Sequence, residues 1–384
     1  MALFEPLKLR ELEIRNRIMM SPMSQRAAGE DGRAVDWHLV HYGSRAVGGC
    51  GLVMVEDTAV APLGRTGHAA LGMYERGQAQ ALGRVVAFCR AQGAAVGLQL
   101  AHAGRKAFSD TRGVAGSISA SAIAFGPGWT APLEARQADL AGVVDSFATA
   151  ARLAVDAGFE VIEIHAAHGY LLHQFLSPLT NLREDGYGGD AASRRRLLLE
   201  VVEAVRAQLP AGLPLFVRLP AGDGEVGGLG VEEVALHARA CAAVGVDLVD
   251  VSGGTPVWEG RRAGGPEVLA LAAALGGDAL GSGSPAGERR LPFALGGGIV
   301  GGADAELLLR DHGASLVSVG RPLLMDPHWP LRAALDLGVT PPLPRAYANA
   351  WREDERERSS AFGGTVFSPD HSKHVDGSMG GETR

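Results

Sequence analysis

Two histidines and a tyrosine stand together where an apolar run in the middle of the chain ends. The run covers residues 161–164, and His165, His168 and Tyr170 follow it directly. Imidazole and phenol groups can donate hydrogen bonds to a developing oxyanion or move protons in general acid–base catalysis. An HxxH pair can also bind zinc or be buried for packing, although the sequence shows no evident third zinc ligand. Spacing alone leaves these kinds of site open.

Apolar, β-branched runs typical of strands alternate along the chain with patterns typical of helices. The eight expected strands cover residues 18–21, 51–56, 95–100, 161–164, 213–219, 247–251, 292–295 and 315–319. Helical patterns between them include residues 146–157, 194–208, 231–243 and 303–312. Eight βα units predict a (β/α)8 TIM barrel, with its chemistry at the carboxyl ends of the strands. A doubly wound sheet is the alternative, but no GxGxxG motif opens a helix after the first strand.

Several segments fall outside the βα alternation. Residues 7–14 predict a small hairpin that closes the barrel floor, and residues 105–138, after the third strand, predict a lid over the barrel mouth. Residues 276–290 form a Gly/Ser-rich loop that we expect to be mobile. We therefore expect one barrel domain over residues 1–351 and a polar, partly disordered tail over residues 352–384.

Residues 165–189 form a long motif that reads HAAHGYLLHQFLSPLTNLREDGYGG. This block resembles that of the Old Yellow Enzyme family of flavin-dependent ene reductases, and the resemblance extends over roughly residues 3–345. In that family the pair matching His165 and His168 binds a substrate carbonyl or a phenolate inhibitor, and the residue matching Tyr170 protonates the substrate α-carbon. The resemblance therefore implies that all three are catalytic and contact substrate. We expect His173 to be a packing residue of the next helix.

The resemblance further implies a site for flavin mononucleotide (FMN). The family's contacts to the flavin ring and phosphate match Ser21, Pro22, Met23, Gln99, Arg218, Gly297, Gly298, Gly320 and Arg321. Glycine at the ends of the last two strands would let the backbone approach the phosphate, and Arg321 would add a bidentate cation. Arg218 would stabilise negative charge on the reduced ring. Taken alone, the glycines and Gln99 could serve structure only, but a purely structural role is less expected for Arg218, which brings a charge to the barrel mouth.

Four positions depart from the thermophilic-like branch of the family, which this chain resembles most. Ser24 replaces a cysteine that lies beside the flavin in that branch, and Arg26 replaces a tyrosine that contacts substrate. Asp57 replaces a small residue at the end of the second strand. Ser24 and Asp57 are expected to lie beside the flavin and Arg26 beside the substrate. Arg26 either pairs with Asp57 or binds an anionic group of the substrate. Asn349 replaces an arginine that reaches a neighbouring subunit in that branch.

The overall composition excludes some partners. Basic and acidic residues balance to 36 − 43 = −7 and are interspersed, so neither nucleic acid nor an anionic membrane is an expected partner. No unbroken apolar run reaches the length of about 18 residues that a membrane span needs. Cys50, Cys89 and Cys241 lie far apart, without a CxxC motif, which suits a reducing cytoplasm.

The function implied by the resemblance is reduction of activated C=C bonds. FMN would accept a hydride from NADPH or NADH and pass it from flavin N5 to the β-carbon of an α,β-unsaturated carbonyl, in a ping-pong cycle. Two alternatives stay open: a biosynthetic flavoenzyme for an anionic or CoA-linked substrate, possibly acting as a desaturase, and a flavin-binding protein without catalysis. The expected partners are a small-molecule substrate and a second copy of the chain in a dimer or tetramer.

Overall fold

The computed structural model describes residues 1–253, 256, 265–276, 291–341, 343–344 and 346–347. Residues 1–342 form one compact unit, which contains every helix and strand given below. Most of the predicted Gly/Ser-rich loop and the whole predicted tail lie outside the described residues, as does the predicted domain boundary at 351.

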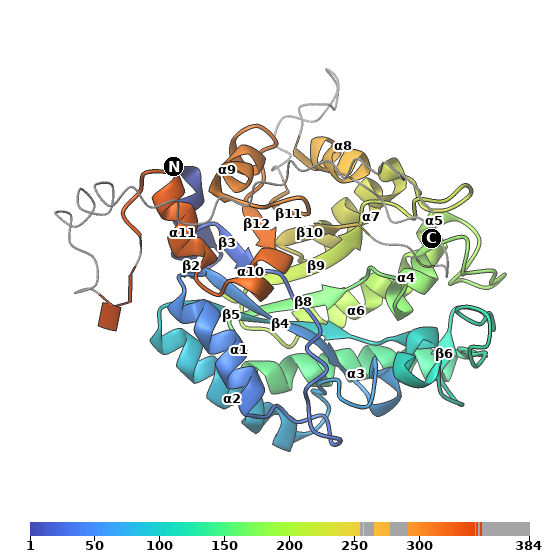
Figure 1. Cartoon of the computed structure of the whole chain (residues 1–384). Helices are drawn as coiled ribbons and strands as arrows, with labels where there is room; N and C mark the ends of the chain where they lie inside the picture. Colours follow the sequence, from blue (N-terminus) through green and yellow to red (C-terminus); the bar gives the residue numbers. More distant parts are fainter. Residues whose placement is uncertain (254–255, 257–264, 277–290, 342, 345, 348–384) are drawn as a thin grey trace, which may run out of the picture. The chain divides into compact units, whose positions relative to one another are not determined.

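Eight parallel strands close into a barrel (Figure 1). In chain order they are β3 (Ile18–Met20), β4 (Leu52–Ala59), β5 (Ala95–Ala101), β8 (Val161–His165), β9 (Leu215–Pro220), β10 (Leu248–Ser252), β11 (Phe293–Gly296) and β12 (Leu316–Val319). Pairing of β12 with β3, with Val319 opposite Met20, closes the ring. The predicted barrel is therefore confirmed, and the doubly wound alternative is excluded.

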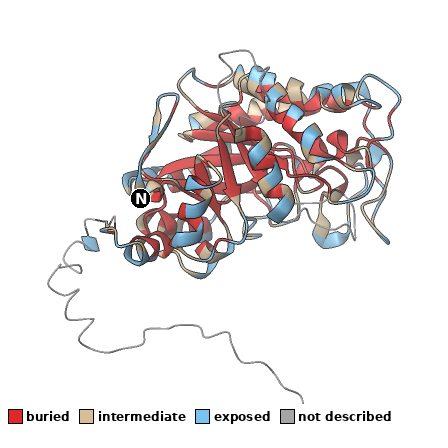
Figure 2. Cartoon of the chain, turned by 90° about the horizontal axis from the view of Figure 1, so that it is seen from above, coloured by how far each residue is buried: buried red, intermediate tan, exposed pale blue. Residues whose placement is uncertain are grey.

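Helices surround the strands and bury one face each against them (Figure 1). They are α1 (Asp36–Val47), α2 (Arg76–Ala91), α3 (Gln137–Asp156), α4 (Leu171–Leu176), α5 (Ala191–Arg194), α6 (Arg196–Arg206), α7 (Val231–Ala243), α8 (Gly265–Gly276), α9 (Gly302–Arg310), α10 (Arg321–Met325) and α11 (Trp329–Asp336). The four predicted helices are confirmed. The prediction for residues 231–243 matches α7 at both ends, the predictions that match α3 and α9 have shifted ends, and the predicted helix over 194–208 is divided between α5 and α6. In α6 the buried residues recur at one-turn spacing, as Leu197, Val201 and Val205 show, because one stripe faces the barrel. Figure 2 shows the same division: strands buried, outer helix faces exposed.

The barrel interior is organised in layers because alternate strand residues point to opposite faces. On β8, Val161 belongs to an inner apolar cluster, whereas Ile162 and Ile164 pack outward against the helices. Glu163 and His165 share the inward face with Val161. The same alternation places Phe216 and Arg218 of β9, and Leu248, Asp250 and Ser252 of β10, on the inward face, with the apolar residue nearest the floor in each strand.

A hairpin seals the floor of the barrel, as the sequence predicted. Strands β1 (Leu7–Leu9) and β2 (Leu12–Ile14) pair antiparallel, and Leu9 and Ile14 join the inner apolar cluster. The insertion after β5 carries a small parallel sheet, β6 (Ile118–Ser119) with β7 (Leu133–Glu134). No helix among the described residues is long and apolar enough to cross a membrane.

Candidate active site

Three barrel strands bring polar residues together at the mouth. His165 is the last residue of β8, and its Cα partner on β9 is Arg218. Ser252 ends β10, two residues beyond Asp250, which in turn is the Cα partner of Arg218. Parallel register therefore places side chains from distant parts of the sequence on one rim.

The two histidines form a hydrogen-bonded chain with Ser252. The Ala167 N–H donates to His165 Nδ1 (3.1 Å), so the ring proton of His165 is on Nε2, 3.1 Å from His168 Nδ1. His168 Nε2 lies 2.6 Å from Ser252 Oγ, which also accepts from Arg218 Nη2 at 3.3 Å and donates to the Gly253 carbonyl. This set of donors and acceptors is consistent only with one neutral tautomer for each ring.

Burial keeps His165 neutral. Its side chain is almost fully enclosed, and burial, followed by the electrostatic effects of His168 and Arg218, holds its pKa well below the ordinary value. A neutral imidazole donates through one nitrogen only. His168 adopts a left-handed backbone conformation (φ 56°), which turns the chain sharply before α4.

Tyr170 joins the histidines as the sequence predicted. It caps the start of α4, and its ring centroid lies 4.7 Å from that of His165. Burial, together with the negative charge of Asp57, raises the pKa of its hydroxyl well above 10, against the opposing charges of Arg26 and Arg218. Tyr170 therefore retains its proton at neutral pH. Lys106 Nζ lies 5.2 Å from the Tyr170 ring centroid and donates to the His168 carbonyl (2.8 Å).

Arg218 occupies the polar layer with a buried carboxylate. Its Nε lies 3.2 Å from Asp250 Oδ2, and its Nη2 donates weakly to Ser21 Oγ at 3.4 Å. Gln99 Nε2 donates to Glu163 Oε1 at 2.7 Å, and both side chains are buried. Neither Glu163 nor Asp250 was predicted as a site residue, although each follows the inward period-two pattern of its strand.

The predicted phosphate end lies at the ends of β11 and β12. Gly297 (φ 104°) and Gly298 (φ 70°) are exposed, and a Cβ on either would meet no atom within 4 Å. Gly320 precedes α10, and a Cβ there would lie 3.6 Å from Met23 Sδ. The exposed Arg321 side chain makes no ion pair or hydrogen bond within the described residues. Among the described residues, this end of the barrel thus offers open backbone and a cation without an internal partner.

The segment after β3 carries the departures from the family pattern. Ser21 N donates to the Val319 carbonyl, and Ser21 and Pro22 are buried. Asp57, at the end of β4, accepts hydrogen bonds from Ser24 Oγ and from Thr66 Oγ1 (3.1 Å). Burial, followed by the charge of Glu56, raises the pKa of Asp57 to about 6.

Arg26 does not pair with Asp57. Its exposed side chain makes no hydrogen bond or ion pair in the described part of the chain, and its backbone is left-handed (φ 52°). The internal Arg26–Asp57 ion pair that the sequence left open is therefore absent. Asn349 lies outside the described residues.

The metal alternative gains no support. Within the described residues, no group of three His, Cys, Asp or Glu side chains could hold a metal ion. The residues do fit FMN: open glycine backbone with Arg321 for a phosphate, and Ser21, Gln99 and Arg218 gathered for the polar edge of a ring. His173 is buried on α4 as expected, but it is hydrogen-bonded to Asp223 rather than only packed.

Known proteins similar to this chain are flavin and NADPH oxidoreductases. The profile of the NADH:flavin oxidoreductase / NADH oxidase family matches residues 2–338. The NADPH dehydrogenase of Geobacillus sp. (strain WCH70) is 39% identical over 357 residues, which cover 91% of this chain and 98% of that protein. The NADPH dehydrogenase of Listeria monocytogenes serovar 1/2a is 41% identical over 358 residues, covering 91% and 99%. A solved structure of morphinone reductase superposes with a TM-score of 0.72 at 26% identity, covering 88% of this chain and 90% of that one.

The family profile spans most of the chain, and relatives near 40% identity align over almost their whole length. The resemblance of the central motif is thereby confirmed. The chain belongs to the NADH:flavin oxidoreductase family, the family of Old Yellow Enzyme, and is an FMN-dependent oxidoreductase that uses NAD(P)H.

Proposed function

We propose that this enzyme reduces activated C=C bonds, with an α,β-unsaturated carbonyl compound as substrate. The observation that carries the proposal is the grouping of His165, His168 and Tyr170 at the barrel mouth. Arg218 lies on the adjacent strand, where it is the Cα partner of His165. Bound FMN supplies the hydride transfer between nicotinamide and substrate. The chain's own residues supply polarisation, a proton and orientation.

The histidine pair binds and polarises the substrate carbonyl. Both rings are neutral. The bond from the Ala167 N–H to Nδ1 leaves the His165 proton on Nε2, and His168 carries its proton on the Nε2 that faces Ser252. A substrate oxygen takes up these donors in place of His168 Nδ1 or Ser252. Preorganised donors of this kind stabilise the enolate-like charge that develops on the oxygen, on the order of 3 kcal/mol each.

Tyr170 supplies the proton for the α-carbon. Its raised pKa keeps the hydroxyl protonated, and its tilted contact with His165 places it beside the same substrate. Proton delivery by a positioned acid contributes typically 10²- to 10⁴-fold to the rate.

The histidine double variant tests this proposal. Anaerobic stopped-flow would follow flavin reduction by NADPH, and then reoxidation by cyclohexenone. His165→Ala combined with His168→Ala should slow reoxidation and weaken phenol binding, while reduction by NADPH suffers less. If the double variant reoxidises with cyclohexenone at the wild-type rate, the pair has a structural role and the proposal fails.

One observation favours a second candidate, a flavoenzyme for an anionic substrate. Arg26 stands where the family carries a tyrosine, and its guanidinium lacks an internal partner within the described residues.

We further propose a homo-oligomer in the cytoplasm. Cys50, Cys89 and Cys241 are buried, and burial raises the pKa of each thiol to about 12, which suits unreactive reduced cysteines.

A further inference from the structure

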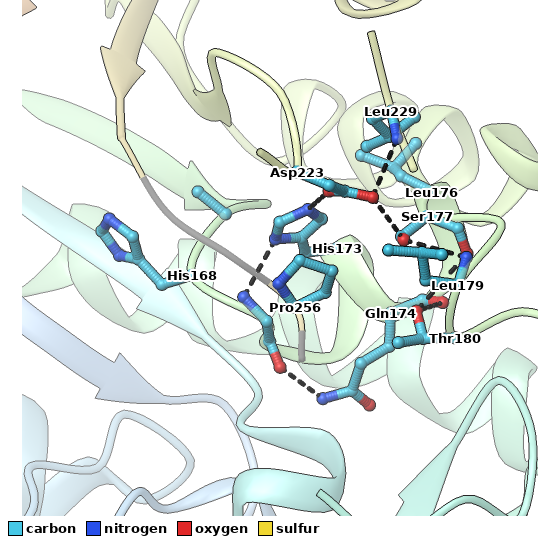
Figure 3. A network of polar contacts seen from close by, with 12 residues as sticks. His168, His173, Gln174, Leu176, Ser177, Leu179, Thr180, Asp223, Leu229 and Pro256 are labelled. Atoms are coloured by element: carbon cyan, nitrogen blue, oxygen red, sulfur yellow. Dashed lines mark hydrogen bonds and ion pairs between the residues drawn. The ribbon is translucent and has the colours of Figure 1, made fainter. Parts of the chain in front are cut away.

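A buried polar network around His173 and Asp223 contacts the turn that follows His168 (Figure 3). His173, on α4, accepts a hydrogen bond from the Gly169 N–H at Nδ1 (2.9 Å). Its Nε2 lies 2.8 Å from Asp223 Oδ1, and both side chains are fully buried.

Asp223 joins segments that are far apart in the sequence. Its Oδ2 accepts from Ser177 Oγ (2.6 Å), at the end of α4, and from the Leu229 N–H (2.8 Å), in the loop after β9. Three donors thus converge on one carboxylate. Burial opposes its charge, but the bonds from His173, Ser177 and Leu229 prevail and lower the pKa of Asp223.

The two bonds of His173 fix its tautomer. Because the Gly169 N–H donates to Nδ1, the ring proton is on Nε2 and donates to the Asp223 carboxylate. Any change that moves the proton to Nδ1 makes Nδ1–H a donor that faces the Gly169 N–H, also a donor, so the hydrogen bond between them is lost.

The held turn is the one that places the predicted catalytic groups. His168 and Gly169 are successive left-handed residues (φ 56° and 72°), an arrangement that the surrounding contacts must maintain. The Gly169 carbonyl accepts from Gln174 Nε2 at 2.7 Å, so both polar groups of this peptide position are bound by α4 side chains. Loss of the hydrogen bond from the Gly169 N–H to His173 would leave the His168 side of the turn without this restraint.

We propose that Asp223 and His173 are a positioning pair that fixes the His168–Tyr170 turn for substrate binding by acting through the Gly169 amide. The proposal rests on the proposed role of the histidine pair. Asp223 sets the His173 tautomer, His173 holds the Gly169 N–H, and the turn holds His168 against Ser252. Neither member of the pair touches substrate.

Asp223→Asn is the sharpest variant because it is nearly isosteric. In either orientation of the amide, its NH₂ group faces a donor: His173 Nε2–H on one side or the Leu229 N–H on the other. In the FMN-loaded enzyme we expect phenol binding, followed by flavin absorbance, to weaken about tenfold or more. Reoxidation by cyclohexenone should slow to a similar extent, with reduction by NADPH within about twofold of wild type.

His173 variants separate positioning from packing. His173→Asn retains an acceptor that can reach the Gly169 N–H, whereas His173→Leu retains volume without any acceptor. We expect His173→Asn to keep more phenol affinity than His173→Leu, about threefold or more. His237→Asn is the matched control, because His237 is also fully buried and faces a carboxylate, Glu233, at 3.3 Å on α7. The control should keep wild-type phenol affinity.

Wild-type phenol affinity and reoxidation rate in Asp223→Asn would overturn the proposal. If Asp223→Asn does not fold, equal phenol affinities in His173→Asn and His173→Leu would overturn it. Failure of the wild-type enzyme itself to bind phenol would instead refute the proposed function, so the two failures are distinct.

Discussion

Nε2 of His168 lies 2.6 Å from the hydroxyl oxygen of Ser252. This bond engages the N–H that the proposed mechanism assigns to the substrate oxygen, so Ser252 competes with substrate for the donor. Ser252→Ala should therefore tighten phenol binding, by about threefold to tenfold for one net hydrogen bond. A spectral titration of the FMN-loaded variant measures this.

Ser146→Ala provides a comparison for that experiment, because Ser146 Oγ on α3 also donates a single hydrogen bond, which is exposed, to the Gly142 carbonyl. It should leave phenol affinity unchanged. Weaker phenol binding in Ser252→Ala would show instead that Ser252 orients His168 and does not compete with substrate.

Glu163 makes the stability of the protein pH-dependent. Burial, followed by the charge of Asp250, raises its pKa to about 8, against the opposing effects of Arg218 and Gln99. In the unfolded chain an ordinary glutamate has a pKa of about 4.3. Between these values the folded state keeps a proton that the unfolded state releases, so the free energy of unfolding falls as pH rises.

Glu163→Gln removes this titration but retains a carbonyl oxygen for the Gln99 bond. The thermal unfolding midpoint of the variant, relative to wild type, should therefore rise between pH 5 and pH 8. Glu232→Gln, an exposed change on α7, should show no such trend. A constant difference between Glu163→Gln and wild type over this pH range would mean that Glu163 is already ionised when folded.

The sequence predicted those parts of the site that follow from local pattern or from the central motif. Eight apolar runs predicted the barrel because buried parallel strands need continuous apolar sequence. Glu163 and Asp250 were missed because each stands alone between apolar neighbours in such a run, and Ser252 because it directly follows one. Counting by twos from His165 would have placed Glu163 inward, but its partner Gln99 depends on the register between β8 and β5.

Other parts depended on three-dimensional contacts alone. His173 and Asp223 lie 50 positions apart, and only the packing of α4 against the loop after β9 brings them together. The sequence likewise left Arg26 with two possible roles, because pairing with Asp57 depends on how the loop after β3 turns. Ser24 and Thr66 bind that carboxylate instead.

Arg321 should hold the FMN phosphate, and its replacement should weaken FMN binding with little effect on the fold. Its side chain is exposed and makes no ion pair or hydrogen bond in the described residues, so Arg321→Met removes no internal contact seen there. A charge-assisted bond contributes about 1.5–3 kcal/mol, so FMN should dissociate more readily by at least about tenfold. Fluorescence of released FMN on dilution gives the dissociation constant.

Arg310→Met is the companion to that variant, because Arg310 is an exposed arginine at the end of the neighbouring α9. It should retain wild-type FMN affinity. Equal losses of FMN affinity in the two variants would indicate a general effect of charge and not a phosphate contact.

Arg26 should select for substrate charge. A guanidinium beside Tyr170, without an internal partner in the described residues, can form bidentate hydrogen bonds to a carboxylate or phosphate on the substrate. Arg26→Tyr should then raise the Michaelis constant for an acidic enoate by more than about tenfold, since such contacts contribute roughly 1.5–3 kcal/mol. The constant for neutral cyclohexenone should stay the same or fall.

Arg33→Tyr separates contact from long-range attraction in that experiment. Arg33 lies on the same loop, is exposed, and pairs with Asp31 at 3.2 Å, so its loss changes the charge of the loop equally. Screening at physiological salt limits long-range attraction to within about 8 Å, so Arg33→Tyr should affect acidic and neutral substrates alike. Parallel changes in both Michaelis constants for Arg26→Tyr would remove Arg26 from substrate recognition and leave the neutral enone as the preferred substrate class.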